Sequence, residues 1–389
     1  MKILITGDWH LDQPKIGRIN PDTDLDLRTE DVFAAVDYMI DYAINNKIDL
    51  FVLNGDLFKG RTSTHHIETL FAERCFKIAS HMRFIINLGN HDYTPKQLSY
   101  GIHTYSILQR FDLPNTEILT EISHKSFDNV DIVFYPYYDL KRAQSTNNEE
   151  LLQWIGSTVN GFELTKDCKL FIGHGTPEGT AIHGSWSFDL DLIDEPVLPQ
   201  KFFESFDMAL FSHIHRCHAI TPKIFHIGSP ERIDFSEVED DKGFSIYDTN
   251  TKQMQWVSTN PRPMAVFEID LLKIDEFDDP TDLIIKEFIN IPNLDQCMLK
   301  ISVECSDKTL SLIEHPRLQE ALGKAFYVQQ PISYSTPKLQ KSRLKEVTEQ
   351  ISEIEALERV VRDRKDFSDT DKEQILLRGR AILGSLNDI

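Results

Sequence analysis

Short apolar runs alternate with amphipathic stretches through the first part of the chain. Residues 2–6, 49–53 and 83–88 have the apolar character of buried strands. Between them, residues 29–46 repeat apolar side chains at the helical period of about 3.6 residues and open on Thr29 and two acids, as a helix N-terminus does. Residues 63–81 are predicted as a second helix. Strand–helix–strand alternation predicts parallel strand pairing and a layered α/β core.

The pattern becomes more β-like after this region, and the core is expected to extend to residue 260. Short strands with little helix between them are predicted at residues 131–135, 169–172, 208–211, 224–227 and 243–247.

The composition changes between Asn260 and Pro263, which suggests further domains. Residues 261–335 mix strand signals at 265–269 and 297–303 with a helix around 280–289, which predicts a small α+β domain. Residues 336–389 are polar and helical, with an apolar stripe formed by Leu339, Leu344, Val347, Ile351, Ile354 and Leu357. Such a stripe is typical of a helix that docks on a partner, and a helix packing back on its own domain would carry it too.

Length and composition indicate a globular protein. The 389 residues suffice for two or three domains with cores of their own. No apolar run approaches the ~18 residues of a membrane span, and the N-terminus leads straight into a strand, so we expect a cytoplasmic protein with no membrane segment. The five cysteines are scattered without a Cys-x-x-Cys pair, which indicates reduced thiols.

The formal net charge of −21 bears on nucleic-acid binding. Proteins that hold DNA tightly are usually basic on the binding face, so this charge argues against tight DNA binding by the chain alone. It does not argue against a DNA substrate, because bound divalent cations would make one face locally positive and a basic partner could supply phosphate contacts.

Candidate metal ligands stand in five short runs at the ends of predicted strands. These runs are Asp8-Trp9-His10, Gly55-Asp56, Gly89-Asn90-His91-Asp92, Gly173-His174 and His213-Ile214-His215. Loops converge at the strand ends of an open α/β sheet, where such folds hold ligands. Each run alone could be an ordinary turn or a pair of surface residues, but the five together predict a site for two divalent metals.

The residue types predict how the ligands divide. Asp8 and His10, at i and i+2 of an extended strand end, would face the same way, and the Asp56 carboxylate could span both ions. One metal would take Asp8, His10, Asp56 and His215; the other would take Asp56, Asn90, His174 and His213. Carboxylate and imidazole donors without thiolates favour manganese, iron or zinc in a catalytic site.

This ligand set predicts phosphoester hydrolysis. Two adjacent cations would acidify a bridging water, and the resulting hydroxide would attack phosphorus in line. His91 is not needed as a ligand and is predicted to protonate or stabilise the leaving oxygen, with Asp92 orienting its ring.

The series of runs resembles the calcineurin-like metallophosphoesterase superfamily, whose pattern is D-x-H, G-D, G-N-H-D/E, G-H and G-H-x-H. The resemblance covers roughly residues 1–250 and implies a layered metallophosphoesterase β-sandwich flanked by helices. Two positions depart from the pattern. Ser212 replaces the usual glycine, a mild change in loop freedom, and Lys59 stands where some relatives carry His or Asp. Lys59 and Arg61 could contact a substrate phosphate instead.

Within the superfamily, the chain is most similar to SbcD-type nuclease subunits of the DNA double-strand-break repair complex. The residues that carry this likeness are Gly7-Asp8-Trp9-His10-Leu11, Gly55-Asp56-Leu57-Phe58, Phe171-Ile172-Gly173-His174-Gly175, and Gly228-Ser229-Pro230-Glu231-Arg232 followed by Lys242-Gly243-Phe244. The resemblance implies manganese-dependent 3′-to-5′ exonuclease and single-strand endonuclease activity on DNA, in repair or recombination.

The same resemblance implies how the protein assembles. Residues 261–335 would form a cap domain, and helices at 63–81 and about 96–111 would build a homodimer. Residues 336–389 would dock on the coiled-coil base of an SMC-like ABC ATPase, SbcC.

Two other functions stay open. A small-substrate nucleotide phosphodiesterase or phosphatase would share the metal site, although protein phosphatases typically carry Asp-Arg-Gly where this chain has Asp56-Leu57-Phe58, and Glu where it has Asp92. A catalytically silent DNA-tethering scaffold would keep the fold without turnover, and the presence of every expected ligand argues against it.

Overall fold

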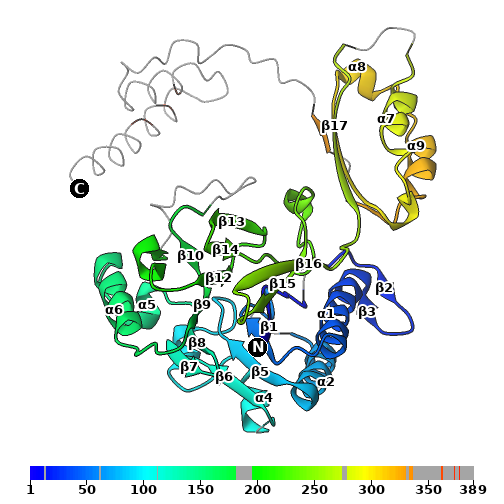
Figure 1. The fold of residues 1–389 in the computed structure, drawn as a ribbon. Coiled ribbons are helices and arrows are strands. Elements are labelled where there is room, and N and C mark those ends of the chain that lie inside the picture. The colour runs from blue at the N-terminus through cyan, green and yellow to red at the C-terminus, as the bar shows by residue number, and fades with distance from the viewer. Residues whose placement is uncertain are drawn as a thin grey trace.

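Two six-stranded sheets pack face to face in this computed structural model, and helices cover their outer faces (Figure 1). The structure describes residues 1–12, 15–60, 63–111, 113–180, 195–273, 278–329 and 333–335, and single positions 361, 372 and 376. The predicted layered α/β class is confirmed.

The first sheet has the order β16-β15-β1-β4-β5-β6. Its strands are β1 (Lys2–Thr6), β4 (Leu50–Asn54), β5 (Arg83–Asn87), β6 (Thr116–Leu119), β15 (Gly243–Asp248) and β16 (Gln253–Ser258). β1, β4 and β5 are parallel, as predicted, and the strand β6, which was not predicted, also pairs parallel; β15 joins β1 antiparallel. Helices α1 (Leu27–Asn45) and α2 (His65–His81) begin after Asp26 and Thr64, whose side chains accept hydrogen bonds from N–H groups of the first turn.

The second sheet has the order β13-β14-β12-β9-β8-β7. Its strands are β7 (Ser123–Ser126), β8 (Val130–Tyr135), β9 (Cys168–His174), β12 (Met208–Ser212), β13 (His218–Thr221) and β14 (Ile224–His226). The four inner strands are parallel, and the outer strands β7 and β13 pair antiparallel.

The prediction of little helix in this region is wrong. Helix α6 (Asn148–Asn160) connects β8 to β9, and the shorter α5 (Leu140–Ala143) precedes it. Parallel neighbours need a crossover connection of about a dozen residues, which is usually a helix. The sequence signal was present, because Asn147 caps the helix ahead of two acids and an apolar stripe of Leu151, Ile155 and Val159.

The strands are apolar on both faces because both faces are buried. In β1, Ile3 and Ile5 point into the core between the two sheets, and Leu4 points into the core beneath the helices. The carboxyl ends of parallel strands from both sheets therefore meet along one edge of the sandwich.

Residues beyond the sandwich form a smaller four-stranded parallel sheet with a core of its own. Its strands are β17 (Met264–Asp270), β18 (Met298–Glu304), β19 (Tyr327–Val328) and β20 (Ser333–Ser335). Helices α7 (Pro280–Phe288) and α9 (His315–Leu322) pack against it, and α8 (Asp307–Leu310) follows β18. Figure 1 shows this unit standing beside the sandwich. The predicted helical tail, residues 336–389, lies outside the described residues except for the three single positions.

The remaining elements are short. They are β2 (Ile19–Asn20), β3 (Leu25–Asp26), α3 (Pro95–Leu98), α4 (Ser106–Arg110), β10 (Thr176–Pro177), β11 (Val197–Leu198) and the 3-10 turns η2 (Gln200–Phe203), η3 (Phe235–Glu237) and η4 (Leu294–Gln296). The helix expected at about 96–111 is thus two pieces, because Gly101, with φ of 68°, turns the chain between them. Among the helices described here, none is long and apolar enough to cross a membrane.

Candidate metal centre

The seven predicted ligands meet at the edge where the strands of both sheets end. Asp8 and His10 follow β1, Asp56 follows β4, Asn90 follows β5, His174 ends β9, and His213 and His215 follow β12. The tertiary structure thus brings together side chains from five loops, as the positions at strand ends predicted.

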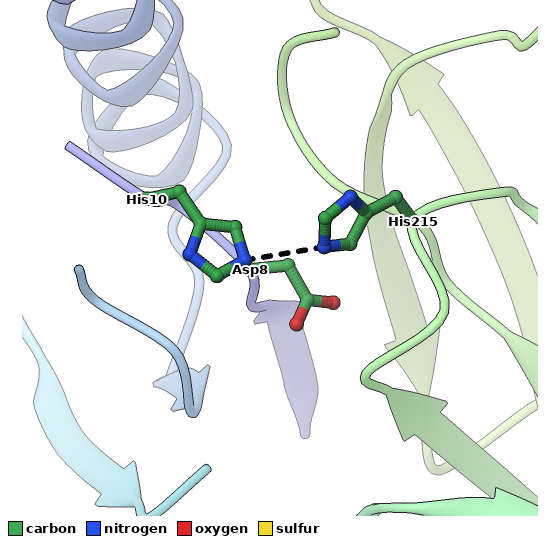
Figure 2. Close-up of side chains that lie close together, drawn as sticks. All are labelled: Asp8, His10 and His215. Atoms are coloured by element: carbon green, nitrogen blue, oxygen red, sulfur yellow. Dashed lines mark hydrogen bonds between the residues drawn. The ribbon is translucent and has the colours of Figure 1, made fainter. Parts of the chain in front are cut away.

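The ligand atoms form two clusters. Those of Asp8, His10 and His215 lie within 4.8 Å of one another, and Figure 2 shows the two rings facing each other beside the Asp8 carboxylate. The ligand atoms of Asp56, His174 and His213 form a second cluster with the same limit. His213 and His215 belong to different clusters, as predicted.

Asp56 and Asn90 lie where the predicted division requires them. Asp56 Oδ2 lies 3.8 Å from His10 Nε2 and 3.5 Å from His174 Nε2, so it faces both clusters. Asn90 Oδ1 lies 3.1 Å from both His174 Nε2 and His213 Nδ1. A carboxylate between the clusters suits a bridging ligand, and the amide oxygen adds a neutral donor to the second cluster.

The donor set fits a pair of divalent cations. His10 Nε2 and His215 Nε2 lie 3.1 Å apart. A neutral imidazole has one N–H donor and one lone pair, so each ring can turn a lone pair toward the other when its second nitrogen carries the proton. A cation facing both lone pairs and the buried carboxylates would satisfy all of them at once. Oxygen and imidazole donors without thiolates suit a catalytic transition-metal site.

Buried negative charge dominates the electrostatics of the centre. Burial disfavours the charged form of His174, but Asp56 and Asp8 outweigh it and raise the pKa of His174 to about 10. Burial also raises the pKa of Asp8, against the pull of His174 and His215. The carboxylates thus attract positive charge strongly, as a cation site does.

The backbone of the ligand loops is strained. Asp8, His10, Asp56 and His213 have φ of 53°, 44°, 59° and 98°, a region that such residues seldom adopt. The expected extended geometry of Asp8 and His10 is therefore wrong, although the two side chains do converge. Gly55, with φ of 87°, has no alternative, because an added Cβ would lie 2.5 Å from His174 Nδ1.

Three of the histidines are held from behind by groups that the sequence analysis missed. His174 Nδ1 donates to the Asn54 carbonyl at 2.8 Å, His213 Nε2 lies 3.1 Å from Glu195 Oε2, and His215 Nδ1 lies 2.8 Å from Glu237 Oε1. Such bonds fix the tautomer, so that the other ring nitrogen presents its lone pair to a metal. Glu195 lies in a loop and Glu237 ends the short turn η3, and neither belongs to a regular sequence pattern, so no sequence signal distinguished them.

A buried amide network joins the two sheets beneath the ligands. Asn87 Nδ2 donates to Asn54 Oδ1 at 2.8 Å, and Asn54 Nδ2 donates to the Gly173 carbonyl at 2.7 Å and to Ser212 Oγ at 3.0 Å. Ser212 ends β12 and, unlike His213, has no left-handed φ. Its expected effect on loop freedom is therefore wrong, because the hydroxyl acts by accepting a hydrogen bond.

His91 stands beside the clusters without joining either. Its Nε2 lies 4.0 Å from Asp56 Oδ2, and its side chain is 31% exposed, so a substrate atom can reach it. The ring hydrogen-bonds to the backbone of Lys59, and burial, followed by smaller effects that include the Lys59 charge, lowers its pKa. Asp12 in turn holds this loop by accepting hydrogen bonds from the N–H groups of Lys59 and Gly60 at 2.6 and 2.8 Å.

The predicted role of Asp92 in orienting His91 is wrong. Asp92 accepts hydrogen bonds from the N–H groups of Asp56, Leu57 and Gly89 at 2.8–3.1 Å and from the Tyr105 hydroxyl at 3.2 Å. None of these partners within the described residues is His91. The tight loop after β4 buries N–H groups that need an acceptor, so the carboxylate holds the Asp56 backbone. Burial, reinforced by Asp56, raises the pKa of Asp92 to about 6.

Of the two residues predicted to contact phosphate, only Lys59 lies in the described part of the chain. Lys59 is exposed, and its charge is one of the smaller effects that lower the pKa of His10, after burial and His215. Arg61 lies outside the described residues.

The sequence of this chain is similar to that of known proteins. The model of the calcineurin-like phosphoesterase family matches residues 1–217. The chain is 23% identical over 267 residues to exonuclease subunit 1 of Enterobacteria phage T4, which covers 67% of this chain and 68% of that protein. It is 23% identical over 316 residues to the DNA double-strand break repair protein Mre11 of Sulfolobus acidocaldarius, covering 78% and 75%.

A third relative is a subunit of the SbcCD nuclease of Staphylococcus epidermidis, 26% identical over 266 residues that cover 65% of this chain and 67% of that protein. The family match takes in 217 of 389 residues and all seven predicted ligands. The protein therefore belongs to the calcineurin-like phosphoesterase family.

Proposed function

We propose that this protein is a metal-dependent DNA nuclease, the catalytic subunit of an SbcCD-like repair or recombination complex. The observation that carries the proposal is the pair of ligand clusters that face each other across Asp56, with His91 open to solvent beside them. The names of three relatives describe an exonuclease, a repair protein and a nuclease subunit, which favours DNA over a small phosphoester.

The roles of the residues follow from their positions. Asp8, His10, Asp56 and His215 would hold one divalent cation, and Asp56, Asn90, His174 and His213 the other, with manganese expected. Bound cations would supply Lewis acidity for the attacking water and the phosphate oxygens. His91 would donate a proton to the leaving oxygen, because its ring lies at the edge of the clusters and is reachable from solvent.

Substrate contact by a strongly acidic chain needs local positive charge. The backbone of Lys59 hydrogen-bonds to the His91 ring, so the Lys59 side chain would supply one such charge. Lys15 and Lys300 line a cavity of about 380 Å³ between the sandwich and the small sheet, together with Phe235 and Tyr327. We infer that residues 261–335 act as a cap over this side of the nuclease domain, residues 1–260.

Two assembly contacts belong to the proposal. Phe76 of α2, Ile107 of α4, and Tyr100 and Phe111, which precede and follow α4 in the sequence, are 49–71% exposed, which suits a homodimer contact. Residues 336–389, outside the described part, would dock on the SMC-like ATPase.

The decisive experiment compares substrates. Purified protein is incubated with Mn²⁺ and labelled linear duplex DNA, single-stranded DNA or a nucleotide diester, with chelator and Asn90→Ala as controls. We expect DNA cleavage from 3′ ends and within single strands, abolished by both controls. Turnover of the diester alone would make the protein a small-substrate phosphodiesterase. DNA processing by the complete complex that survives Asn90→Ala would make it a scaffold.

A further inference from the structure

A buried ion pair lies behind His215, on the far side of the ring from Asp8 and His10. Glu237, at the end of η3, places Oε1 2.8 Å from His215 Nδ1 and Oε2 2.7 Å from Lys242 Nζ. Lys242 is fully buried and Glu237 is 9% exposed. Fully buried lysines are rare, so this one is held for a reason that its partners should reveal.

The Lys242 ammonium holds the same histidine twice. It donates to the His215 carbonyl at 2.9 Å and contacts Glu237, the carboxylate that binds the ring of His215. A further hydrogen bond to Ser229 Oγ at 3.1 Å provides for the third proton of the ammonium. The backbone and the imidazole of one predicted ligand are therefore fixed by one side chain.

The turn that carries Glu237 has little freedom of its own. Arg232 Nε donates to the Glu237 carbonyl at 3.1 Å, and Arg232 Nη2 donates to the Asp240 carbonyl at 2.9 Å. The Ile233 N–H donates to Glu237 Oε2 at 2.9 Å. The carboxylate is thus held in position by contacts with the protein itself.

The second cluster is built differently. His213 also meets a carboxylate, Glu195, but that group is held by the hydroxyls of Thr176 at 2.6 Å and Tyr137 at 3.2 Å. Within the described residues, an ammonium of this kind serves the first cluster alone. Each cluster therefore has a histidine held by a glutamate, but Glu237 is bound by an ammonium and Glu195 by two hydroxyls.

We propose that Glu237 and Lys242 are positioning residues that fix the His215 imidazole for a divalent cation at the Asp8–His10–His215 cluster. The inference rests on the proposed function only in taking that cluster to bind metal. It predicts a property of metal binding that holds whatever the substrate is, so DNA cleavage is not needed to test it.

The test is a manganese titration of the metal-stripped full-length protein. Binding is measured by calorimetry and by the electron paramagnetic resonance signal of free Mn²⁺. Wild type should bind two ions. Glu237→Gln should weaken one event ~10–100-fold and leave the other unchanged, as loss of an outer partner of a metal ligand does. The same substitution should add nothing when His10→Ala has already disabled the first cluster, and should still act beside His174→Ala.

Two further variants separate positioning from a purely structural ion pair. Lys242→Met removes the buried cation that faces the Glu237 carboxylate and the His215 carbonyl, and should lower both metal affinity and melting temperature. The double variant Glu237→Gln/Lys242→Met leaves no charge unpaired, so its melting temperature should recover while its metal affinity stays low. Lys252→Met, which breaks the exposed pair with Asp207, is the control and should change neither.

Several results would overturn the proposal. Wild-type affinity in Glu237→Gln would do so, and so would recovery of metal affinity together with stability in the double variant. Wild type that binds two ions but cuts no DNA would remove the proposed function and leave this inference standing. Wild type that binds no manganese would remove both.

Discussion

At the residue scale, the centre combines strained ligand backbones with rigid support. Asp56 has a left-handed φ of 59°, and its N–H group is held by Asp92 at 2.9 Å. Strain of this kind persists only when the surroundings over-determine the conformation, and it collects at functional sites. Asp92, which the sequence predicted to orient His91, therefore binds the backbone of the loop that carries Asp56.

His91→Ala should separate catalysis from metal binding. Its ring lies outside both ligand clusters, so manganese affinity should stay near that of wild type. Loss of a proton donor to the leaving oxygen should lower kcat on DNA by ~10²–10⁴-fold. The measurements are single-turnover cleavage and Mn²⁺ titration, with the exposed His65→Ala as the matched control. Equal loss of metal and turnover would mean that His91 is a ligand.

At the element scale, the local patterns predicted most strands and helices of the sandwich. The helix α6 was not predicted, and neither was the antiparallel direction of the predicted strand β15; both follow from how the chain returns to the sheets. Single side chains complete these connections. Asp131 in β8 accepts from His124 Nε2 in β7 at 3.0 Å and from the Lys166 N–H ahead of β9 at 2.8 Å.

Asp131→Asn should cause a loss of stability that depends on pH. Burial alone would raise the pKa of Asp131, but hydrogen bonds from the Lys166 N–H, Ser126 and His124 hold it below its ordinary value of 3.8. A carboxyl group with a lowered folded-state pKa stabilises the fold above its unfolded pKa, and that stabilisation disappears as the pH falls through the folded one. At pH 7 the variant should lose ~1–3 kcal/mol.

Urea unfolding at pH 7 and pH 3 measures this difference. The difference in unfolding free energy between wild type and Asp131→Asn should be smaller at pH 3 than at pH 7. Asp128→Asn, which changes an exposed acid in the same hairpin, should not differ from wild type at either pH. A gap that is equal at both pH values would mean that the contribution of Asp131 does not come from its charge.

At the scale of the whole molecule, the proposed function requires an acidic chain to gain affinity for DNA, and assembly would be one way to supply it. The apolar side chains of Tyr100 and Phe111 are 71% and 69% exposed, and a second copy would cover them. Two active sites joined in this way would hold DNA at two points, which increases effective affinity without a basic face.

The variant Ile107→Glu/Phe111→Glu should therefore be monomeric, because charges placed in an apolar contact oppose its burial. Sedimentation velocity would show the change, and manganese binding should stay normal. Leu312→Glu, at a 55% exposed position in the small sheet domain, is the control and should leave the assembly unchanged. If wild type is itself a monomer at micromolar concentration, the homodimer contact is refuted.

Local sequence determined much of this protein. Apolar periodicity predicts β1, β4, β5, α1 and α2 within a few residues, because each element buries one regular pattern of side chains. The five polar runs predicted seven side chains that the structure brings together, since side-chain chemistry and position at strand ends are both properties of sequence.

Only the tertiary structure decided what stands behind those ligands. Asn54, Glu195, Glu237 and Lys242 gain their roles from neighbours far along the chain, and no spacing in the sequence predicts which acid will meet which ring. The partners of Asp92 were equally unpredictable from the sequence, because they include buried N–H groups of another loop. Ligand identity is local chemistry, whereas support of the ligands is a property of packing.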